Sequence, residues 1–370
     1  MRTARDVRAR HTTSLLLTCL PEVPSADPIG RAHMLNEETG RQVMRVDTAS
    51  AAEKGGGTAR KIAEQVSVLT RDGVRLAVRD SGPRTGAVCT VVLLHGWCLR
   101  NTCWAGVRAD LRRRYGPAVR VIAPDHRGHG RSSDAALSSY RLEQLALDLA
   151  DVLTALGVTG PVVLGGHSLG GMVALTYLGL PARQRPVEPA GLVLIATAAG
   201  RLAERGLGRL LAAPALGVLV EILARTPHHG ADQVVRALVG PACRAVARAR
   251  GLRGRERATL AAAVADAVHT TALGTAVGFL PALKSHDVYP TLGAIAIPAV
   301  VVSGGLDLLT PIEHAHDLVS GITGALHFHI PGAGHMLLCD APKVVSAAFT
   351  RMIQTVAVGY APVDSGVEAM

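Results

Sequence analysis

The feature that most constrains the fold is a series of short apolar runs, each bounded by turn-forming residues and followed by a segment with helical periodicity. Apolar runs without a polar alternation are typical of strands buried on both faces of a parallel sheet. Strands that alternate with helices form βαβ units. We therefore expect an α/β protein with a doubly wound, mostly parallel sheet. The predicted strands span residues 90–94, 119–123, 161–164, 191–195, 299–302 and 326–330, and helices are predicted at 140–156 and 169–180.

A hairpin is expected to precede the parallel strands. Residues 66–70 and 74–78 both alternate between apolar and polar side chains, and Arg71-Asp72-Gly73 between them is a turn sequence. Alternation of this kind is typical of antiparallel strands that are buried on one face.

Composition and periodicity divide the chain into four parts. Residues 1–64 mix charges, Pro and Gly without periodicity, and we expect a disordered N-terminal extension. Residues 65–198 and 290–355 should form the core, interrupted by a helical cap at 199–289 that shows no strand signal, and 356–370 should be a flexible tail. An insertion after a strand of such a sheet lies above the ligand crevice.

The composition excludes several classes of protein. The net charge is +10, but the basic residues are almost all Arg and no aromatic residues are interleaved with them, so no nucleic-acid partner is expected. No apolar run is long enough to span a bilayer. The apolar patch at 15–17 is short for a secretion signal, which favours the cytoplasm. An Arg cluster at 244–257 leaves peripheral contact with an anionic membrane open.

The strongest chemical signal is the segment Gly166-His167-Ser168-Leu169-Gly170-Gly171. The pattern G-x-S-x-G occurs by chance, but here it follows a predicted strand directly and precedes a predicted helix. Small residues on both sides allow a tight strand-to-helix turn that exposes the central hydroxyl beside a helix N-terminus. The context therefore predicts that Ser168 is a nucleophile.

A serine nucleophile requires a base, and the base requires an acid that orients it. Asp307 follows the predicted strand at 299–302, and His335 follows the last predicted strand in a Gly-rich loop. The chain order Ser, Asp, His is that of nucleophile-elbow enzymes. We expect Ser168, Asp307 and His335 to form a catalytic triad.

Acyl transfer also needs hydrogen-bond donors for the oxyanion. One candidate is the backbone N–H of Leu169, directly after the nucleophile. The other is the backbone N–H of Trp97, which follows His95-Gly96 at the end of the strand at 90–94. The Trp97 side chain either lines the acyl pocket or packs under the insertion.

With these landmarks, the chain resembles the α/β-hydrolase fold superfamily over residues of about 65 to 355, in its serine esterase/lipase-like and haloperoxidase-like branch. The resemblance rests on His95-Gly96, the segment 125–132, the Ser168 elbow, Gly305-Leu306-Asp307 and Gly334-His335. It implies that the insertion is a lid and that 125–132 is a structural turn. Because Ser replaces the Asp that dehalogenases and epoxide hydrolases have at the elbow, an acyl-enzyme is implied.

The expected activity is hydrolysis of a carboxylic ester, or a similar acyl bond, with an apolar acyl group. No cofactor and no metal are expected. The motifs leave C–C bond hydrolysis and cofactor-free haloperoxidase or perhydrolase chemistry open as alternatives, and a ligand-binding receptor with a slow triad as an alternative of another class. The sequence names neither the substrate nor the oligomeric state.

Overall fold

The computed structural model describes residues 46–49, 64–212, 218, 221 and 271–359. In these residues the sheet has nine strands in the order β1-β2-β3-β5-β4-β6-β7-β8-β9. The pairs β1–β2, β2–β3 and β3–β5 are antiparallel, and all other neighbours are parallel. This confirms the predicted doubly wound, mostly parallel sheet. The strands are β1 (Val46–Ala49), β2 (Glu64–Leu69), β3 (Arg75–Ser81), β4 (Cys89–Leu94), β5 (Val119–Pro124), β6 (Val162–His167), β7 (Gly191–Ile195), β8 (Ala299–Gly304) and β9 (Leu326–Ile330).

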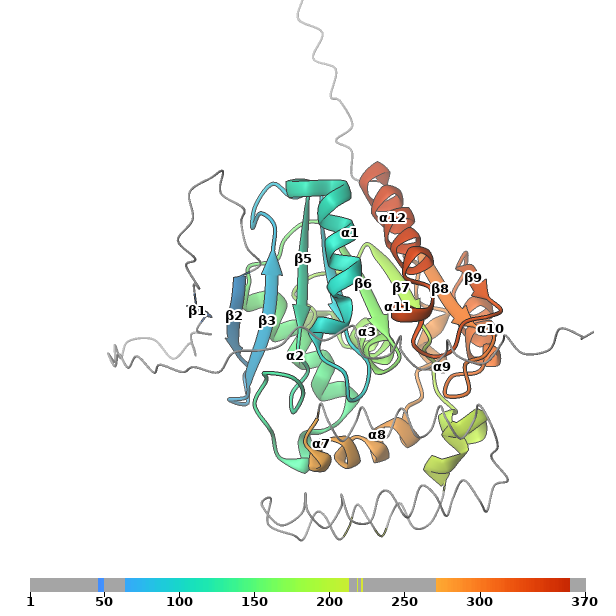
Figure 1. The fold of residues 1–370 in the computed structure, drawn as a ribbon. Coiled ribbons are helices and arrows are strands. Elements are labelled where there is room, and N and C mark those ends of the chain that lie inside the picture. Colours follow the sequence, from blue (N-terminus) through green and yellow to red (C-terminus); the bar gives the residue numbers. More distant parts are fainter. Residues whose placement is uncertain (1–45, 50–63, 213–217, 219–220, 222–270, 360–370) are drawn as a thin grey trace, which may run out of the picture. The chain divides into compact units, whose positions relative to one another are not determined.

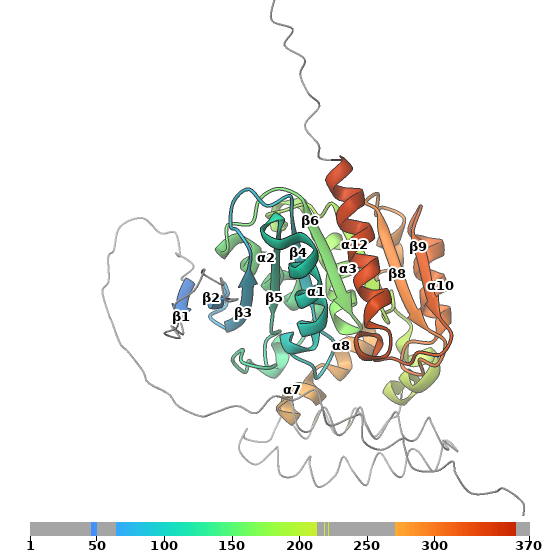
Figure 2. The ribbon, with the colours of Figure 1, turned by 45° about the horizontal axis from the view of Figure 1, so that its top comes forward.

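Helices cover both faces of the sheet, with α1 and α12 in front of it and α2 and α3 behind it in Figure 1. Figure 2 shows α10 beside β8 and β9 at one edge of the sheet. The longer helices are α1 (Ala105–Tyr115), α2 (Leu142–Ala155), α3 (Leu169–Gly179), α10 (Ile312–Gly321) and α12 (Pro342–Gly359). The shorter ones are α7 (Leu273–Gly278), α8 (Leu280–Ser285), α9 (Tyr289–Leu292) and α11 (Leu337–Asp340).

Two hydrophobic clusters, one on each face, explain why the central strands are apolar at nearly every position. Leu164 faces the cluster that includes α2, α3 and α10, whereas its neighbour Val163 faces the cluster that includes α1 and α12. Every residue of β4, β5, β6 and β8 is buried. A strand covered on both faces has no solvent side on which polar residues would alternate.

The antiparallel edge of the sheet extends further than the sequence indicated. The hairpin of β2 and β3 forms with the turn at Gly73, whose φ is +84°. In addition, β1 pairs with β2, although residues 46–49 fall within the extension predicted to be disordered. The free backbone edge of β2 provides hydrogen-bonding groups that a further strand can pair with, and apolar periodicity does not report such pairing. The rest of residues 1–64, apart from Glu64, lies outside the described residues.

The two ends of the predicted insertion lie side by side. Ala199 accepts a hydrogen bond from the Val288 N–H (2.8 Å), and Gly200 pairs with Asp287. The insertion is predicted to begin with a helix over 207–223, but residues 206–212 form a 3-10 helix instead. The other two predicted cap helices, at 231–249 and 257–269, lie outside the described residues, as does the Arg cluster at 244–257.

The C-terminal helix passes the predicted boundary at 355. Helix α12 continues to Gly359. Its buried apolar side chains, among them Phe349, Met352 and Val356, extend along the helix past residue 355, and the helix packs on β6 and β7. The remainder of the predicted tail, residues 360–370, lies outside the described residues. Among the helices that the structure describes, none has the length and apolarity required to cross a bilayer.

Gly165 sets how closely α12 approaches β6, because a Cβ there would lie 2.3 Å from two ring atoms of Phe349. We expect Gly165→Ala to lower the free energy of unfolding by about 1–3 kcal/mol through overpacking. In a Phe349→Leu background the same substitution should cost less, since the clashing ring is gone. Chemical denaturation of the four proteins measures this cycle.

Gly106 on α1 is the matched control, because no atom lies within 4 Å of a Cβ placed there. Gly106→Ala should leave stability unchanged or raise it by up to about 1 kcal/mol, as expected for Gly replaced in a helix. Equal costs for Gly165→Ala in both backgrounds would show that Phe349 does not set this packing.

Candidate active site

Ser168 lies in a strained turn between β6 and α3. Its φ is +52°, a left-handed value that residues with a Cβ seldom adopt. The turn closes because glycines surround it: a Cβ on Gly166 would lie 2.3 Å from the Gly170 carbonyl, and a Cβ on Gly170 would lie 2.1 Å from the Leu94 oxygen. The predicted elbow therefore forms, with Ser168 as the N-cap of α3.

Hydrogen bonds to the end of β7 and to the residues after it hold the elbow in place. The Ser168 N–H donates to the Ile195 carbonyl (2.9 Å) at the end of β7. The Thr197 hydroxyl donates to the Ser168 carbonyl (2.7 Å), and the Thr197 side chain is where a Cβ on Gly171 would clash. Thr197 is a supporting residue that the sequence did not single out, because nothing in its local pattern marks it.

The structure brings all three predicted triad residues together. His335 Nε2 lies 3.1 Å from Ser168 Oγ, and His335 Nδ1 lies 2.8 Å from Asp307 Oδ2. The Asp307 side chain is fully buried, and the His335 side chain is 10% exposed. Because the carboxylate accepts the proton on Nδ1, Nε2 keeps its lone pair toward the serine hydroxyl.

Asp307 is held as a carboxylate by its own loop. It accepts the backbone N–H groups of Leu309 and Thr310 (both 2.9 Å) and the Thr310 hydroxyl (2.7 Å), besides His335. Burial alone would raise the pKa of Asp307, but the charge of His335 and the hydrogen bonds from His335 and Thr310 bring that pKa below its ordinary value. Asp307 is therefore ionised at neutral pH and can accept the proton on His335 Nδ1.

The loops after β8 and β9 are in close backbone contact, and this contact sets the distance between Asp307 and His335. A Cβ on Gly304 would lie 2.5 Å from the Ala333 oxygen, and a Cβ on Gly305 would lie 2.7 Å from the Pro331 oxygen. The Leu306 N–H donates to the Ala333 carbonyl (2.9 Å). The Gly residues noted beside Asp307 thus allow backbone contact between two loops far apart in the sequence.

His167, which precedes Ser168, connects the elbow to His335. Its Nε2–H donates to the His335 carbonyl (3.0 Å), and burial lowers the pKa of His167 to about 4, so the ring is neutral. Sequence reasoning missed this role, because position x of a G-x-S-x-G segment carries no pattern of its own.

The two predicted oxyanion donors lie in segments that pack against each other. Leu169 is the first residue of α3, where the backbone N–H has no intrahelical partner. The loop that carries Trp97 contacts the elbow: a Cβ on Gly96 would lie 2.7 Å from His167 Nδ1, and Gly170 abuts the Leu94 carbonyl. The Trp97 indole N–H donates to the Ala276 carbonyl (3.0 Å) in α7, so this side chain packs against the returning end of the insertion.

The segment 125–132 forms a turn, as expected, and its residues 125–129 are buried. The Asp125 carboxylate accepts the backbone N–H groups of Asn101 (2.6 Å) and Arg131 (3.0 Å). The fully buried Arg127 guanidinium pairs with Asp148 and Asp72. These bonds fix the turn beside the loop that carries Trp97.

The family model described as the alpha/beta hydrolase fold matches residues 90–342. This chain belongs to the alpha/beta hydrolase fold family. An uncharacterized protein from Mycobacterium tuberculosis (strain ATCC 25618 / H37Rv) is 30% identical over 293 residues, which are 77% of this chain and 80% of that protein. A thermophilic esterase from Thermogutta terrifontis, solved with malate bound, is 27% identical with a TM-score of 0.58, over 80% of this chain and 100% of that chain. A non-heme chloroperoxidase from Streptomyces lividans is 36% identical over 129 residues, 35% of this chain and 43% of that protein.

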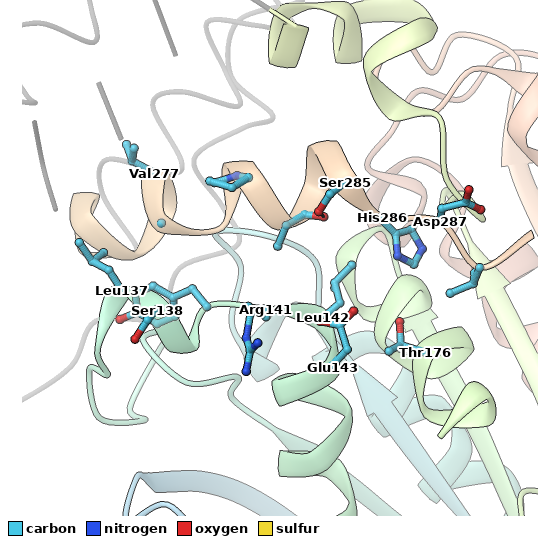
Figure 3. Close-up of a pocket in the computed structure, with 15 residues that line it drawn as sticks. Leu137, Ser138, Arg141, Leu142, Glu143, Thr176, Val277, Ser285, His286 and Asp287 are labelled. Atoms are coloured by element: carbon cyan, nitrogen blue, oxygen red, sulfur yellow. Dashed lines mark hydrogen bonds between the residues drawn. The ribbon is translucent and has the colours of Figure 1, made fainter. Parts of the chain in front are cut away.

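This alpha/beta hydrolase also has a cavity of about 530 Å³ whose lining includes none of the triad residues. Figure 3 shows it between α8 and the start of α2, with Leu142, Thr176 and His286 at its walls. We assign it no part in the chemistry. Among the described residues, no group of His, Cys, Asp and Glu side chains is arranged to hold a metal ion.

The buried, neutral histidines predict that this protein loses stability in mild acid. Burial lowers the pKa of His126 to about 3 and those of His129 and His167 to about 4, against about 6.5 in an unfolded chain. The unfolded chain therefore binds protons that the native rings do not, and the free energy of unfolding should fall from pH 6.5 towards pH 4. Each ring contributes up to about 1.4 kcal/mol per pH unit.

Urea unfolding at several pH values between 4.5 and 7 measures this slope. His129→Gln should reduce it by up to about 1.4 kcal/mol per pH unit, because one such ring is gone. Ser168→Ala, which removes no group that titrates in this range, should keep the wild-type slope. The same slope in His129→Gln and wild type would contradict the prediction.

Proposed function

We propose that this alpha/beta hydrolase is a serine hydrolase that cleaves carboxylic esters, or similar acyl bonds, through an acyl-enzyme. The observation that carries the proposal is the continuous hydrogen-bonded chain from Asp307 through His335 to Ser168, with distances of 2.8 and 3.1 Å. A serine hydroxyl is a weak nucleophile unless such a base takes its proton. The 27% identity to a thermophilic esterase that aligns over its whole length supports the same reaction class.

In the proposed reaction, Ser168 Oγ attacks the acyl carbonyl while His335 Nε2 takes the hydroxyl proton. Asp307 stabilises the imidazolium and keeps its orientation. The backbone N–H groups of Trp97 and Leu169 bind the oxyanion of the tetrahedral intermediate. His335 then gives its proton to the leaving alcohol, and water repeats the sequence to release the acid.

The substrate proposed is a small molecule with an apolar acyl group. Support comes from the composition of the predicted cap, which is rich in Leu, Ala and Val. A predicted lid of this composition favours acyl groups that leave water on binding.

The first experiment is hydrolysis of p-nitrophenyl esters, from acetate to palmitate, by wild type and Ser168→Ala. We expect Ser168→Ala to lower kcat by at least about 10³-fold, because the nucleophile is lost while substrate binding is kept. Ser346→Ala on α12, a serine that the proposed mechanism does not use, should retain wild-type activity. Full esterase activity in Ser168→Ala would refute the mechanism.

Perhydrolysis is a second candidate function on the same triad. It is favoured by the 36% identity to the chloroperoxidase and by a bifunctional esterase/perhydrolase from Acinetobacter calcoaceticus, which is 36% identical over 126 residues. Acetate-dependent bromination with hydrogen peroxide, measured beside ester hydrolysis, separates the two. Halogenation that exceeds hydrolysis and disappears in Ser168→Ala would favour perhydrolysis.

A further inference from the structure

Two peptide planes flank Trp97, and each is fixed by a buried histidine. On the N-terminal side, the Gly96 carbonyl accepts His95 Nδ1–H (2.8 Å) and the Leu99 N–H (3.1 Å). A peptide unit is planar, and in the trans form its N–H points opposite to its C=O. Holding the Gly96 oxygen therefore also sets the direction of the Trp97 N–H.

On the C-terminal side, His129 Nε2 accepts the Cys98 N–H (3.2 Å). Cys98 has a φ of +59°, a left-handed value that costs about 1–3 kcal/mol in a residue with a Cβ. A bond that holds this peptide plane opposes relaxation of the strained residue. His129 thus acts on the one side of Trp97 that His95 does not reach.

The hydrogen bonds of these rings determine where each proton lies. His95 Nε2 accepts the His126 N–H (2.9 Å), so the His95 proton is on Nδ1. His129 Nδ1–H donates to the Arg127 carbonyl (3.0 Å), so His129 Nε2 is an acceptor. His95 and His129 are at most 1% exposed. Neutral rings with these tautomers are the forms that hold the loop.

Trp97 and His129 both contact the residues at the end of the insertion, from Thr271 to Phe279. His129 pairs with Thr271 in an isolated β-bridge, and its ring centroid lies 5.5 Å from that of Phe279. The Trp97 indole N–H binds the Ala276 carbonyl. Trp97 therefore contacts α7, His129 contacts residues on either side of α7, and His129 returns to the loop through the Cys98 N–H.

We propose that His129 is a positioning residue for oxyanion stabilisation: its Nε2 holds the Cys98 N–H and so aims the Trp97 N–H at the reacting carbonyl. This inference rests on the proposed ester hydrolysis. His129 does not touch the substrate. Its effect is on the transition state, where the oxyanion is formed, and not on binding of the ground state.

The test compares His129→Leu, which removes the acceptor, with His129→Gln, whose amide oxygen can accept the same N–H. Removal of a whole oxyanion donor costs about 10²–10³-fold in kcat. A donor that is still present but misdirected should cost about 10–100-fold. We expect that loss in His129→Leu with KM changed by less than about threefold, and kcat within about threefold of wild type in His129→Gln.

Rates are expressed per active site titrated with an acylating reagent, so that loss of folded protein does not count as loss of kcat. A second readout is inhibition by a trifluoromethyl ketone, whose adduct with Ser168 carries an oxyanion. Its affinity should fall in His129→Leu by about the same factor as kcat/KM. If His129→Leu yields no folded enzyme, His129→Met fills the site with a flexible side chain and a weak acceptor, and the same result is expected.

The matched control is His286→Leu. His286 is also a buried histidine, with 6% exposure, and it lines the cavity between α8 and α2 to which no part in the chemistry is assigned. It should keep wild-type kcat. Wild-type kcat in the folded His129→Leu or His129→Met enzyme would overturn the inference. So would a loss of kcat in His129→Gln equal to that in His129→Leu. In both cases the proposed function stands as long as the esterase activity requires Ser168. Activity of wild type no higher than that of Ser168→Ala would overturn the proposed function, and this inference with it.

Discussion

The backbone of Ser168 is held in a conformation that its own side chain disfavours, and the rest of the site depends on this constraint. A φ of +52° costs about 1–3 kcal/mol, and it persists because β6 and α3 on either side are buried and cannot move apart. The same conformation lifts the hydroxyl out of the backbone towards His335. The strain at one residue is thus offset by the packing of two elements, and it places the Ser168 hydroxyl beside His335.

Close backbone approach is the second condition, and it is met where side chains are absent. Gly166 and Gly170 let α3 begin directly against the end of β4. Gly304 and Gly305 let the loop of Asp307 touch the loop of His335. At Gly170, Gly304 and Gly305 a single Cβ would separate segments that come from different strands, and at Gly166 it would clash with the start of α3. The geometry of the Ser168, Asp307 and His335 side chains therefore depends on glycines, which have no side chain.

Burial also decides protonation around the site. His95, His126, His129 and His167 are kept neutral because a charged ring would lose its hydration, and each neutral ring then offers one donor and one acceptor at defined atoms. The surroundings of His335 are different, since 10% of its side chain is exposed and its Nδ1 lies 2.8 Å from Asp307 Oδ2. Histidines within a small region thus have two roles, one structural and one proposed to be catalytic, and their surroundings decide which.

The amino-acid sequence by itself determined the parallel sheet and the identity and order of Ser168, Asp307 and His335. Strands buried on both faces need uninterrupted apolar runs, and a strand-to-helix elbow needs small residues beside its serine, so both leave local patterns. Tertiary structure alone decided the pairing of β1, the bond from Thr197, the contact of Trp97 with α7 and the place of His129 beside Cys98. These depend on contacts between residues far apart in the chain. A hydrogen bond of that kind requires only a suitable atom at the right place, which many residue types can supply, and no local pattern records it.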